Sequence, residues 1–267
     1  MKKFLISAVI FLSAISGGMS EGRGSITVLG DSIASGYGLS EYVSGNDYSA
    51  PESFGNLLGA ESTHYENYAV DGRRSEELLA AVSDETDPIV RSVADADNVI
   101  ISIGGNDFLK PLLDGIKTAA LTDTDFFISL LEGEVSSGSI SEYTNNILQS
   151  ALTAAKAVDV NGSVSNIRKI VEKISTLNPG ARIILLTVYD PFAGNVLLTA
   201  ASEAAEEKLS ELNEGIKSLA GSNVYVADIY ETFKGHEAEY TNIGRLDIHP
   251  NSAGHNRIYE VLSEMTR

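Results

Sequence analysis

Four separated segments of the chain carry side chains that could do covalent chemistry. They are LGDSIASGYG at 29–38, NYAVDGRRS at 67–75, SIGGND at 102–107 and LDIHPNSAGH at 246–255. Each segment alone is ordinary, because glycine and small polar residues are typical of turns that follow strands. Together they supply a hydroxyl from Ser32, an amide from Asn106 and an imidazole from His249.

These groups are the parts that acyl transfer needs. A serine hydroxyl is a poor nucleophile at neutral pH, and a histidine within hydrogen-bond reach would take its proton during attack and return it to the leaving group. The oxyanion that forms needs hydrogen-bond donors held in place. The backbone N–H groups of Ser32 and Gly72 and the side-chain amide of Asn106 could supply them.

Some of these residues also have simpler roles. Gly72 could serve a turn that needs a positive φ, and Asn106 could cap a following helix. Of the remaining histidines, His255 is expected to be structural, on the last helix. His64 and His236 have no partner motif and are expected in solvent or in the core.

Other reaction classes lack their motifs. Ser32 is not within a Gly-x-Ser-x-Gly elbow, HEAEY at 236–240 has no second histidine for a zinc helix, and no phosphate-binding glycine loop is present. The acids between 84 and 97 do not have the spacing of a calcium loop and indicate a solvated face. The chain has no cysteine, which excludes disulfides and thiolate catalysis. We therefore expect no metal and no cofactor.

Five apolar, β-branched runs could form the scaffold, at 26–29, 65–70, 99–103, 182–188 and 224–228. Helical patterns lie between or after them, at 75–82, 165–177 and 198–219 and in a final helix after Pro250. This alternation predicts a parallel sheet buried on both faces, in three α/β/α layers. The carboxyl ends of parallel strands share one edge of a sheet, so the first three chemical segments should converge there.

An insertion without a strand signal occupies 108–164 and should be helical. It contains DFFISLLEG at 125–133, a Gly/Ser-rich break at 136–139 and a helix around 141–158. It could be a mobile cap over a pocket or a packed pair of extra helices. Its apolar side chains could cover an acyl chain or form a core, namely Leu112, Leu113, Phe126, Phe127, Leu130 and Leu131. Tyr189 and Phe192, in VYDPF at 188–192, could line the same pocket or belong to a proline turn.

The first twenty residues have the layout of a secretory signal peptide, with two lysines and then an apolar run too short for a comfortable membrane span. We expect residues 21–267 to form a single domain, secreted by a bacterium. Loss of Lys2 and Lys3 with no acid takes the formal charge from −18 to −20. Such a charge argues against nucleic-acid binding and against a stable membrane anchor.

The order of the motifs resembles that of the SGNH or GDSL hydrolase superfamily over nearly the whole chain, least over 108–164. The matching residues are Gly30-Asp31-Ser32 with Gly36, then Gly72, then Gly104-Gly105-Asn106-Asp107, and finally His249-Pro250. The resemblance implies a flavodoxin-like three-layer fold and hydrolysis of esters. It implies Ser32 as nucleophile and His249 as base. It also implies Ser32, Gly72 and Asn106 as the oxyanion donors.

The sequence departs from the family pattern beside His249. The family usually places its orienting aspartate three residues before the histidine, where this chain has Leu246; the nearest acid is Asp247, two residues before. Asp247 is the candidate third member of the triad. A backbone carbonyl near Leu246 is the alternative, because it would also fix the histidine tautomer.

These expectations describe a secreted, metal-independent serine esterase that forms an acyl-enzyme at Ser32. The expected substrates are lysophospholipids or short- to medium-chain acyl esters. A carbohydrate O-acetyl esterase is the rival enzyme, and it would need a small, polar pocket. A catalytically silent binding module on the same scaffold is the rival from another class.

Overall fold

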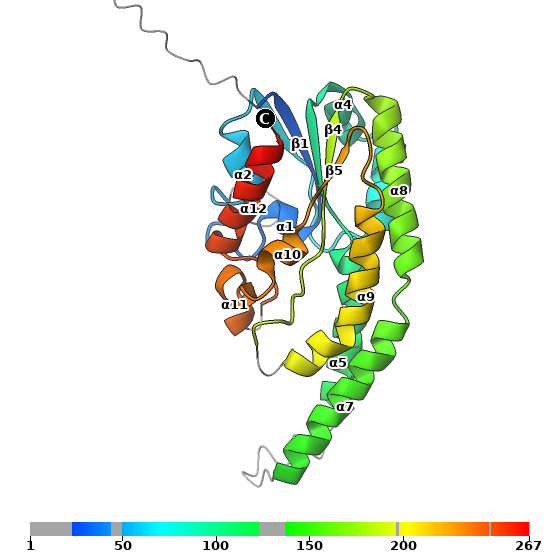
Figure 1. The fold of residues 1–267 in the computed structure, drawn as a ribbon, viewed down its shortest axis with the longest axis vertical. Coiled ribbons are helices and arrows are strands. Elements are labelled where there is room, and N and C mark those ends of the chain that lie inside the picture. The colour runs from blue at the N-terminus through cyan, green and yellow to red at the C-terminus, as the bar shows by residue number, and fades with distance from the viewer. Residues whose placement is uncertain (1–22, 44–49, 123–136, 196–197, 246, 267) are drawn as a thin grey trace, which may run out of the picture.

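Five parallel strands form the centre of the computed structural model, which describes residues 23–43, 50–122, 137–195, 198–245 and 247–266 (Figure 1). The strands are β1 (Ser25–Gly30), β2 (His64–Asn67), β3 (Asn98–Ser102), β4 (Arg182–Leu186) and β5 (Val224–Ala227). Their order in the sheet is β2-β1-β3-β4-β5, which is the flavodoxin-like order. The predicted fold class is confirmed, and each strand lies in one of the predicted runs or overlaps it.

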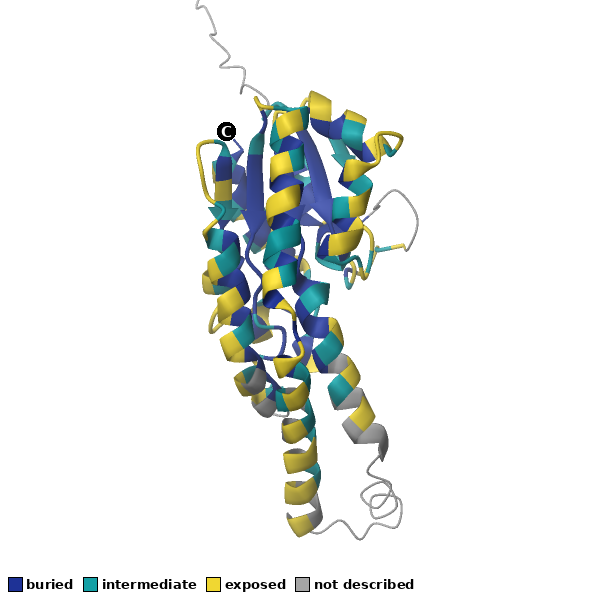
Figure 2. Cartoon of the chain, turned by 90° about the vertical axis from the view of Figure 1, so that its right-hand side faces the viewer, coloured by how far each residue is buried: buried dark blue, intermediate teal, exposed yellow. Residues whose placement is uncertain are grey.

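Both faces of the sheet are covered by helices. In β3, Val99 and Ile101 pack into one core, whereas Ile100 packs into the other, because successive side chains of a strand point to opposite faces. The first core includes residues of α3 (Ser75–Ser83), α4 (Pro88–Asp95), α8 (Val160–Leu177) and α9 (Thr199–Lys217). The second includes residues of α1 (Ser32–Ser35), α2 (Phe54–Gly59), α10 (Ile229–Phe233) and α12 (Ser252–Met265). Figure 2 shows the strands buried behind helices whose outer faces are exposed.

Helix ends follow the capping residues. α8 begins at Val160 rather than at 165, because the Asp159 side chain accepts the N–H of Gly162 and caps the helix there. α12 begins after Asn251, whose side chain accepts the N–H of Gly254. Several short elements lacked a clear signal in the sequence, namely α2, α4, α10, α11 (Glu237–Tyr240) and the 3₁₀ turn η2 (Ile243–Arg245).

The predicted helical insertion begins with α5 (Gly105–Thr122) and continues, after residues 123–136, with α7 (Ser137–Lys156). These two helices lie side by side and reach away from the sheet (Figure 1). Part of the expected Gly/Ser break therefore belongs to α7, since serine and glycine suit a helix N-terminus. Leu112 is fully buried in the core, so it does not cover a ligand. The segment 125–133 lies outside the described residues.

The predicted signal peptide at 1–20 also lies outside the described residues. Across the part of the chain that the structure describes, no helix combines the length and the apolar character that crossing a membrane requires.

His255 has the structural position that the sequence predicts. It is fully buried on α12, stacks on Phe54, and its Nδ1 accepts the backbone N–H of Phe54 at 3.4 Å. Burial lowers the pKa of His255 to about 3, with a smaller contribution from the charge of His249. His64 and His236 lie at the surface, where their side chains are 67% and 57% exposed.

We expect acid to destabilise the fold through His255. Its folded-state pKa lies below the ordinary value of about 6.5, so the unfolded chain takes up this proton first as pH falls. The stabilisation from neutral His255 is complete above about pH 6.5 and is lost progressively toward about pH 3. By about pH 5 the contribution of His255 alone to the free energy of unfolding should have fallen by about 2 kcal/mol.

Denaturant unfolding of wild type and His255→Gln measures this loss. Glutamine is neutral and can still accept the Phe54 N–H, so the variant should lack the acid-dependent loss of stability that His255 causes. The contributions of other titrating groups are the same in both proteins and cancel in the comparison. An identical pH dependence for both proteins would contradict the prediction.

Candidate active site

Ser32 lies directly beyond the carboxyl end of β1, as its place in the sequence predicts. Gly30 has a φ of +154°, and a Cβ there would collide with the carbonyl oxygen of Ser102, so only glycine permits this exit from the strand. Asp31 then caps α1 by accepting the N–H of Ile33, and Ser32 is the first residue of that helix. The local sequence thus fixes the direction of the Ser32 side chain.

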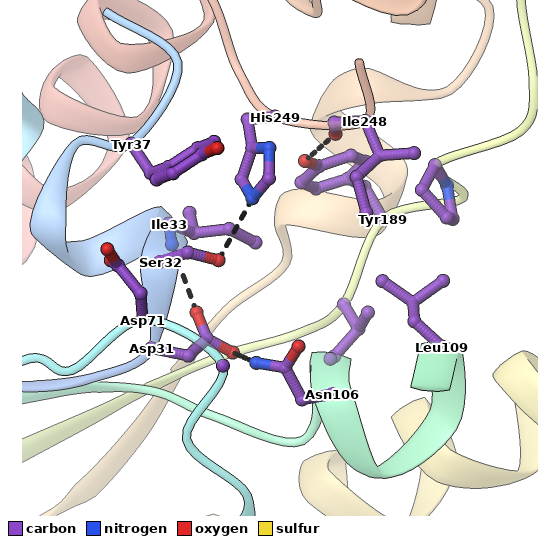
Figure 3. Close-up of a pocket in the computed structure, with 14 residues that line it drawn as sticks. Asp31, Ser32, Ile33, Tyr37, Asp71, Asn106, Leu109, Tyr189, Ile248 and His249 are labelled. Atoms are coloured by element: carbon purple, nitrogen blue, oxygen red, sulfur yellow. Dashed lines mark hydrogen bonds between the residues drawn. The ribbon is translucent and has the colours of Figure 1, made fainter. Parts of the chain in front are cut away.

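His249 reaches Ser32 across 217 positions of sequence. Its Nε2 lies 3.0 Å from Ser32 Oγ, which is the contact that a general base needs (Figure 3). The ring of Tyr37 packs against the imidazole, with 4.5 Å between the ring centroids. The imidazole is mostly shielded, with its side chain 17% exposed.

Asp247 reaches the other side of the same imidazole. Its Oδ1 lies 2.6 Å from His249 Nδ1 and also accepts the backbone N–H of His249 at 3.1 Å. This second bond makes a turn of the aspartate-turn type, which folds the histidine back toward the carboxylate. A spacing of two residues is therefore sufficient. Leu246, whose carbonyl was the alternative, lies outside the described residues.

The three predicted oxyanion donors border one cavity. Within the described residues, neither the Ser32 N–H, in the first turn of α1, nor the Gly72 N–H donates to a protein acceptor. Gly72 has a φ of +75°, so the predicted positive φ is present as well. Asn106 does not cap a helix, because α5 begins at Gly105; its Nδ2 donates to the Arg73 carbonyl at 3.1 Å.

Two further acidic residues from the same sequence segments connect the loops that carry these donors. Asp71 accepts hydrogen bonds from Ser35 Oγ at 2.6 Å and from the Tyr42 hydroxyl, which ties the Gly72 turn to α1. Asp107 accepts both the N–H and the hydroxyl of Ser75, at 2.8 and 2.6 Å. Sequence reasoning assigned no role to Asp71. Its place beside Gly72 was the only available signal.

Asp31 is a buried acid next to the nucleophile candidate. Its Oδ2 faces the Asn106 amide nitrogen at 3.4 Å (Figure 3). Burial raises the pKa of Asp31 to about 7; the N–H of Ile33 acts in the opposite direction, and the charges of Asp107 and Asp71 add to the rise. The carboxyl group therefore changes charge near neutral pH, beside the cavity.

The cavity has a volume of about 280 Å³ and an apolar wall beside Ser32 and His249. Tyr189 lines it as predicted, whereas Phe192 is buried in the core and does not. Sequence reasoning missed most of the wall because its residues come from four separate segments. The apolar wall consists of Ile33, Leu109, Val188, Tyr189, Pro191 and Ile248.

Comparison with known proteins identifies the family of the chain. The model of the GDSL-like Lipase/Acylhydrolase family matches residues 28–257. The spore germination lipase LipC of Bacillus licheniformis is 28% identical over 90% of this chain and 93% of its own length. The uncharacterized protein YpmR of Bacillus subtilis is 23% identical over 90% of this chain and 81% of its own.

Solved structures show the same fold. An extracellular lipase from Streptomyces rimosus superposes with a TM-score of 0.65 at 22% identity, covering 90% of this chain and 99% of that one. Phospholipase A1 from Streptomyces albidoflavus gives a TM-score of 0.61 at 21% identity, covering 90% and 98%. Since the family match runs from β1 into α12, the chain belongs to the GDSL-like lipase/acylhydrolase family and is a carboxylic ester hydrolase.

Proposed function

We propose that this protein is a serine esterase that forms an acyl-enzyme at Ser32. The observation that carries the proposal is the chain of contacts from Ser32 Oγ to His249 Nε2 at 3.0 Å and from His249 Nδ1 to Asp247 at 2.6 Å. It supports a mechanism rather than a silent binding module, because nothing about ligand binding alone needs this alignment.

The proposed reaction has two steps. Ser32 Oγ attacks the ester carbonyl while His249 Nε2 takes its proton; the bond to the alcohol then breaks, and His249 gives the proton to the departing oxygen. Water then attacks the acyl-enzyme while His249 takes its proton. His249 returns a proton to Ser32 Oγ as the carboxylic acid leaves. Asp247 holds the imidazole with its proton on Nδ1, so that Nε2 is free to accept.

The oxyanion of each step would be bound by three donors. These are the N–H groups of Ser32 and Gly72 and Nδ2 of Asn106, which border the same cavity; Nδ2 would leave one of its bonds, to the Arg73 carbonyl or to Asp31, to reach the oxyanion. Removal of one such donor commonly lowers turnover by about 10² to 10³.

The proposed substrates are lysophospholipids or short- to medium-chain acyl esters, and the cavity favours the shorter chains. The wall of the cavity is apolar, which does not suit an acetylated sugar, and its volume of about 280 Å³ is small for a long chain. The similarity to a lipase supports lipid esters. The proposal includes secretion, which the signal-peptide layout of residues 1–20 supports.

A series of p-nitrophenyl esters tests the substrate class. Each methylene that the cavity buries should raise kcat/KM by up to about 4-fold, so butyrate should exceed acetate by about 10-fold. The rise should stop near octanoate, and palmitate should be slower. A preference for acetate, together with release of acetate from acetylated xylan, would instead indicate the carbohydrate esterase.

Covalent labelling tests the mechanism independently of the substrate. A fluorophosphonate should add to Ser32, as mass spectrometry of the peptides would show, and Ser32→Ala should stay unlabelled. No label and no turnover of any ester would favour the binding module.

A further inference from the structure

A long-range hydrogen bond holds the backbone beside His249. The hydroxyl of Tyr189, in the loop after β4, donates to the carbonyl oxygen of Ile248 at 2.6 Å (Figure 3). Ile248 is the residue between Asp247 and His249. The bond therefore acts on the middle of the short turn that carries the catalytic pair, and none of the family motifs includes Tyr189.

Tyr189 is itself firmly placed. The backbone of Val188 donates to Asn213 Oδ1 and accepts from Asn213 Nδ2, both at 2.8 Å, which fixes the loop to α9. The Tyr189 ring packs on Phe233 with 4.9 Å between centroids. Burial raises the pKa of Tyr189 well above its ordinary value, with the charges of Asp31 and Asp247 adding to the rise. The hydroxyl thus remains a donor at any working pH.

The two hydrogen bonds that Asp247 makes to His249 do not by themselves place the turn relative to Ser32. Both bonds lie inside the turn, so they fix His249 relative to Asp247 but not the turn relative to Ser32. On its outer side the turn is tied to Asn242. The carbonyl of Asn242 accepts the N–H of Asp247 at 3.4 Å, its N–H donates to the carbonyl of His249 at 2.9 Å, and its side chain donates to the carbonyl of Gly38 at 3.2 Å. Only Tyr189, within the described residues, connects the Ile248 carbonyl to the sheet.

We propose that Tyr189 is a positioning residue of the hydrolase. By binding the Ile248 carbonyl, its hydroxyl fixes how closely the Asp247–His249 turn lies against the sheet and so aligns His249 Nε2 with Ser32 Oγ. This inference rests on the proposed function, because it assumes His249 as the base.

The first test is Tyr189→Phe, which removes one oxygen and keeps the ring in the cavity wall. We expect kcat on p-nitrophenyl butyrate to fall about 10- to 100-fold, since small misplacements of catalytic groups have effects of this size, while KM stays unchanged. Tyr259→Phe is the matched control: it loses a 2.6 Å hydrogen bond to Glu61 on the exposed side of α12 and should keep full activity. An unchanged kcat in Tyr189→Phe would overturn the inference.

A double-mutant cycle with Asp247→Asn separates positioning from general support of the fold. If Tyr189 acts through the turn, its removal should lower kcat clearly less in Asp247→Asn than in wild type. Equal losses in both backgrounds would overturn the inference. p-Aminophenylalanine at position 189, which keeps a donor at the ring's para position, should restore most of kcat. This substitution also covers the case in which Tyr189→Phe folds poorly, and a failure to restore kcat in folded protein would count against the proposal.

The fluorophosphonate label distinguishes the two ways of failing. If wild type labels at Ser32 but Tyr189 shows no coupling to Asp247, only this inference fails. If wild type does not label at Ser32, the proposed function fails first.

Discussion

Replacing Asp247 with asparagine should lower kcat about 10⁴-fold, the loss known for a triad histidine held in the wrong tautomer. Asparagine can still accept the backbone N–H of His249, so the turn should survive. If the amide instead turns its NH₂ to the place of Oδ1, it donates to His249 Nδ1, which places the ring proton on Nε2, and the backbone N–H of His249 loses this acceptor. The imidazole could then no longer accept the proton of Ser32, and kcat on p-nitrophenyl butyrate measures the loss.

A remote aspartate provides the control for this substitution. Asp228 caps α10, pairs with Lys217 at 2.9 Å and does not line the cavity, so Asp228→Asn should retain activity. If Asp247→Asn or Asp247→Ala lost less than about 10-fold, a backbone carbonyl near Leu246 would be the better candidate for the orienting group.

The largest expected effect belongs to the nucleophile and its base. Ser32→Ala and His249→Ala should each lower kcat about 10⁶-fold, and the double variant should be no slower than either single one, because the two groups act as a unit. Neither group is useful without the other: an unactivated serine attacks slowly, and a base without its nucleophile has no proton to move. Single-turnover rates with p-nitrophenyl butyrate measure all three variants.

Ser83→Ala, at the exposed end of α3, is the control for loss of a serine and should behave as wild type. Turnover near the wild-type rate in Ser32→Ala would place the nucleophile elsewhere. A double variant much slower than both single ones would show that the two side chains contribute independently.

β1, β3 and β4 were predictable because they are buried on both faces and so appear in the sequence as nearly continuous apolar runs. β2, with the sequence HYEN, is exposed to half-buried, and its signal was correspondingly weaker. The ends of helices were less predictable where a capping residue decides the boundary, as Asp159 does for α8. The short α2 and α4 lack enough turns for a periodic pattern, and tertiary packing stabilises them instead.

The meeting of Ser32, Gly72 and Asn106 was predictable from topology, since each follows a strand of one parallel sheet. The hydrogen bond between Asp247 and His249 was not predictable, because it depends on how a three-residue turn folds back on itself. The bond from Tyr189 to Ile248 was also beyond sequence reasoning. It joins residues 59 positions apart, and no local pattern encodes it.

Two of the buried titrating groups, Asp31 and His255, have pKa shifts of opposite sign, to about 7 and about 3. On unfolding between roughly pH 4 and pH 6.5, Asp31 releases a proton and His255 takes one up. Their contributions to net proton exchange therefore nearly cancel. The carboxyl group kept beside the nucleophile and the imidazole kept in the core therefore act in opposite directions on mild acidification: the proton that His255 takes up on unfolding weakens the fold, and the proton that Asp31 releases strengthens it.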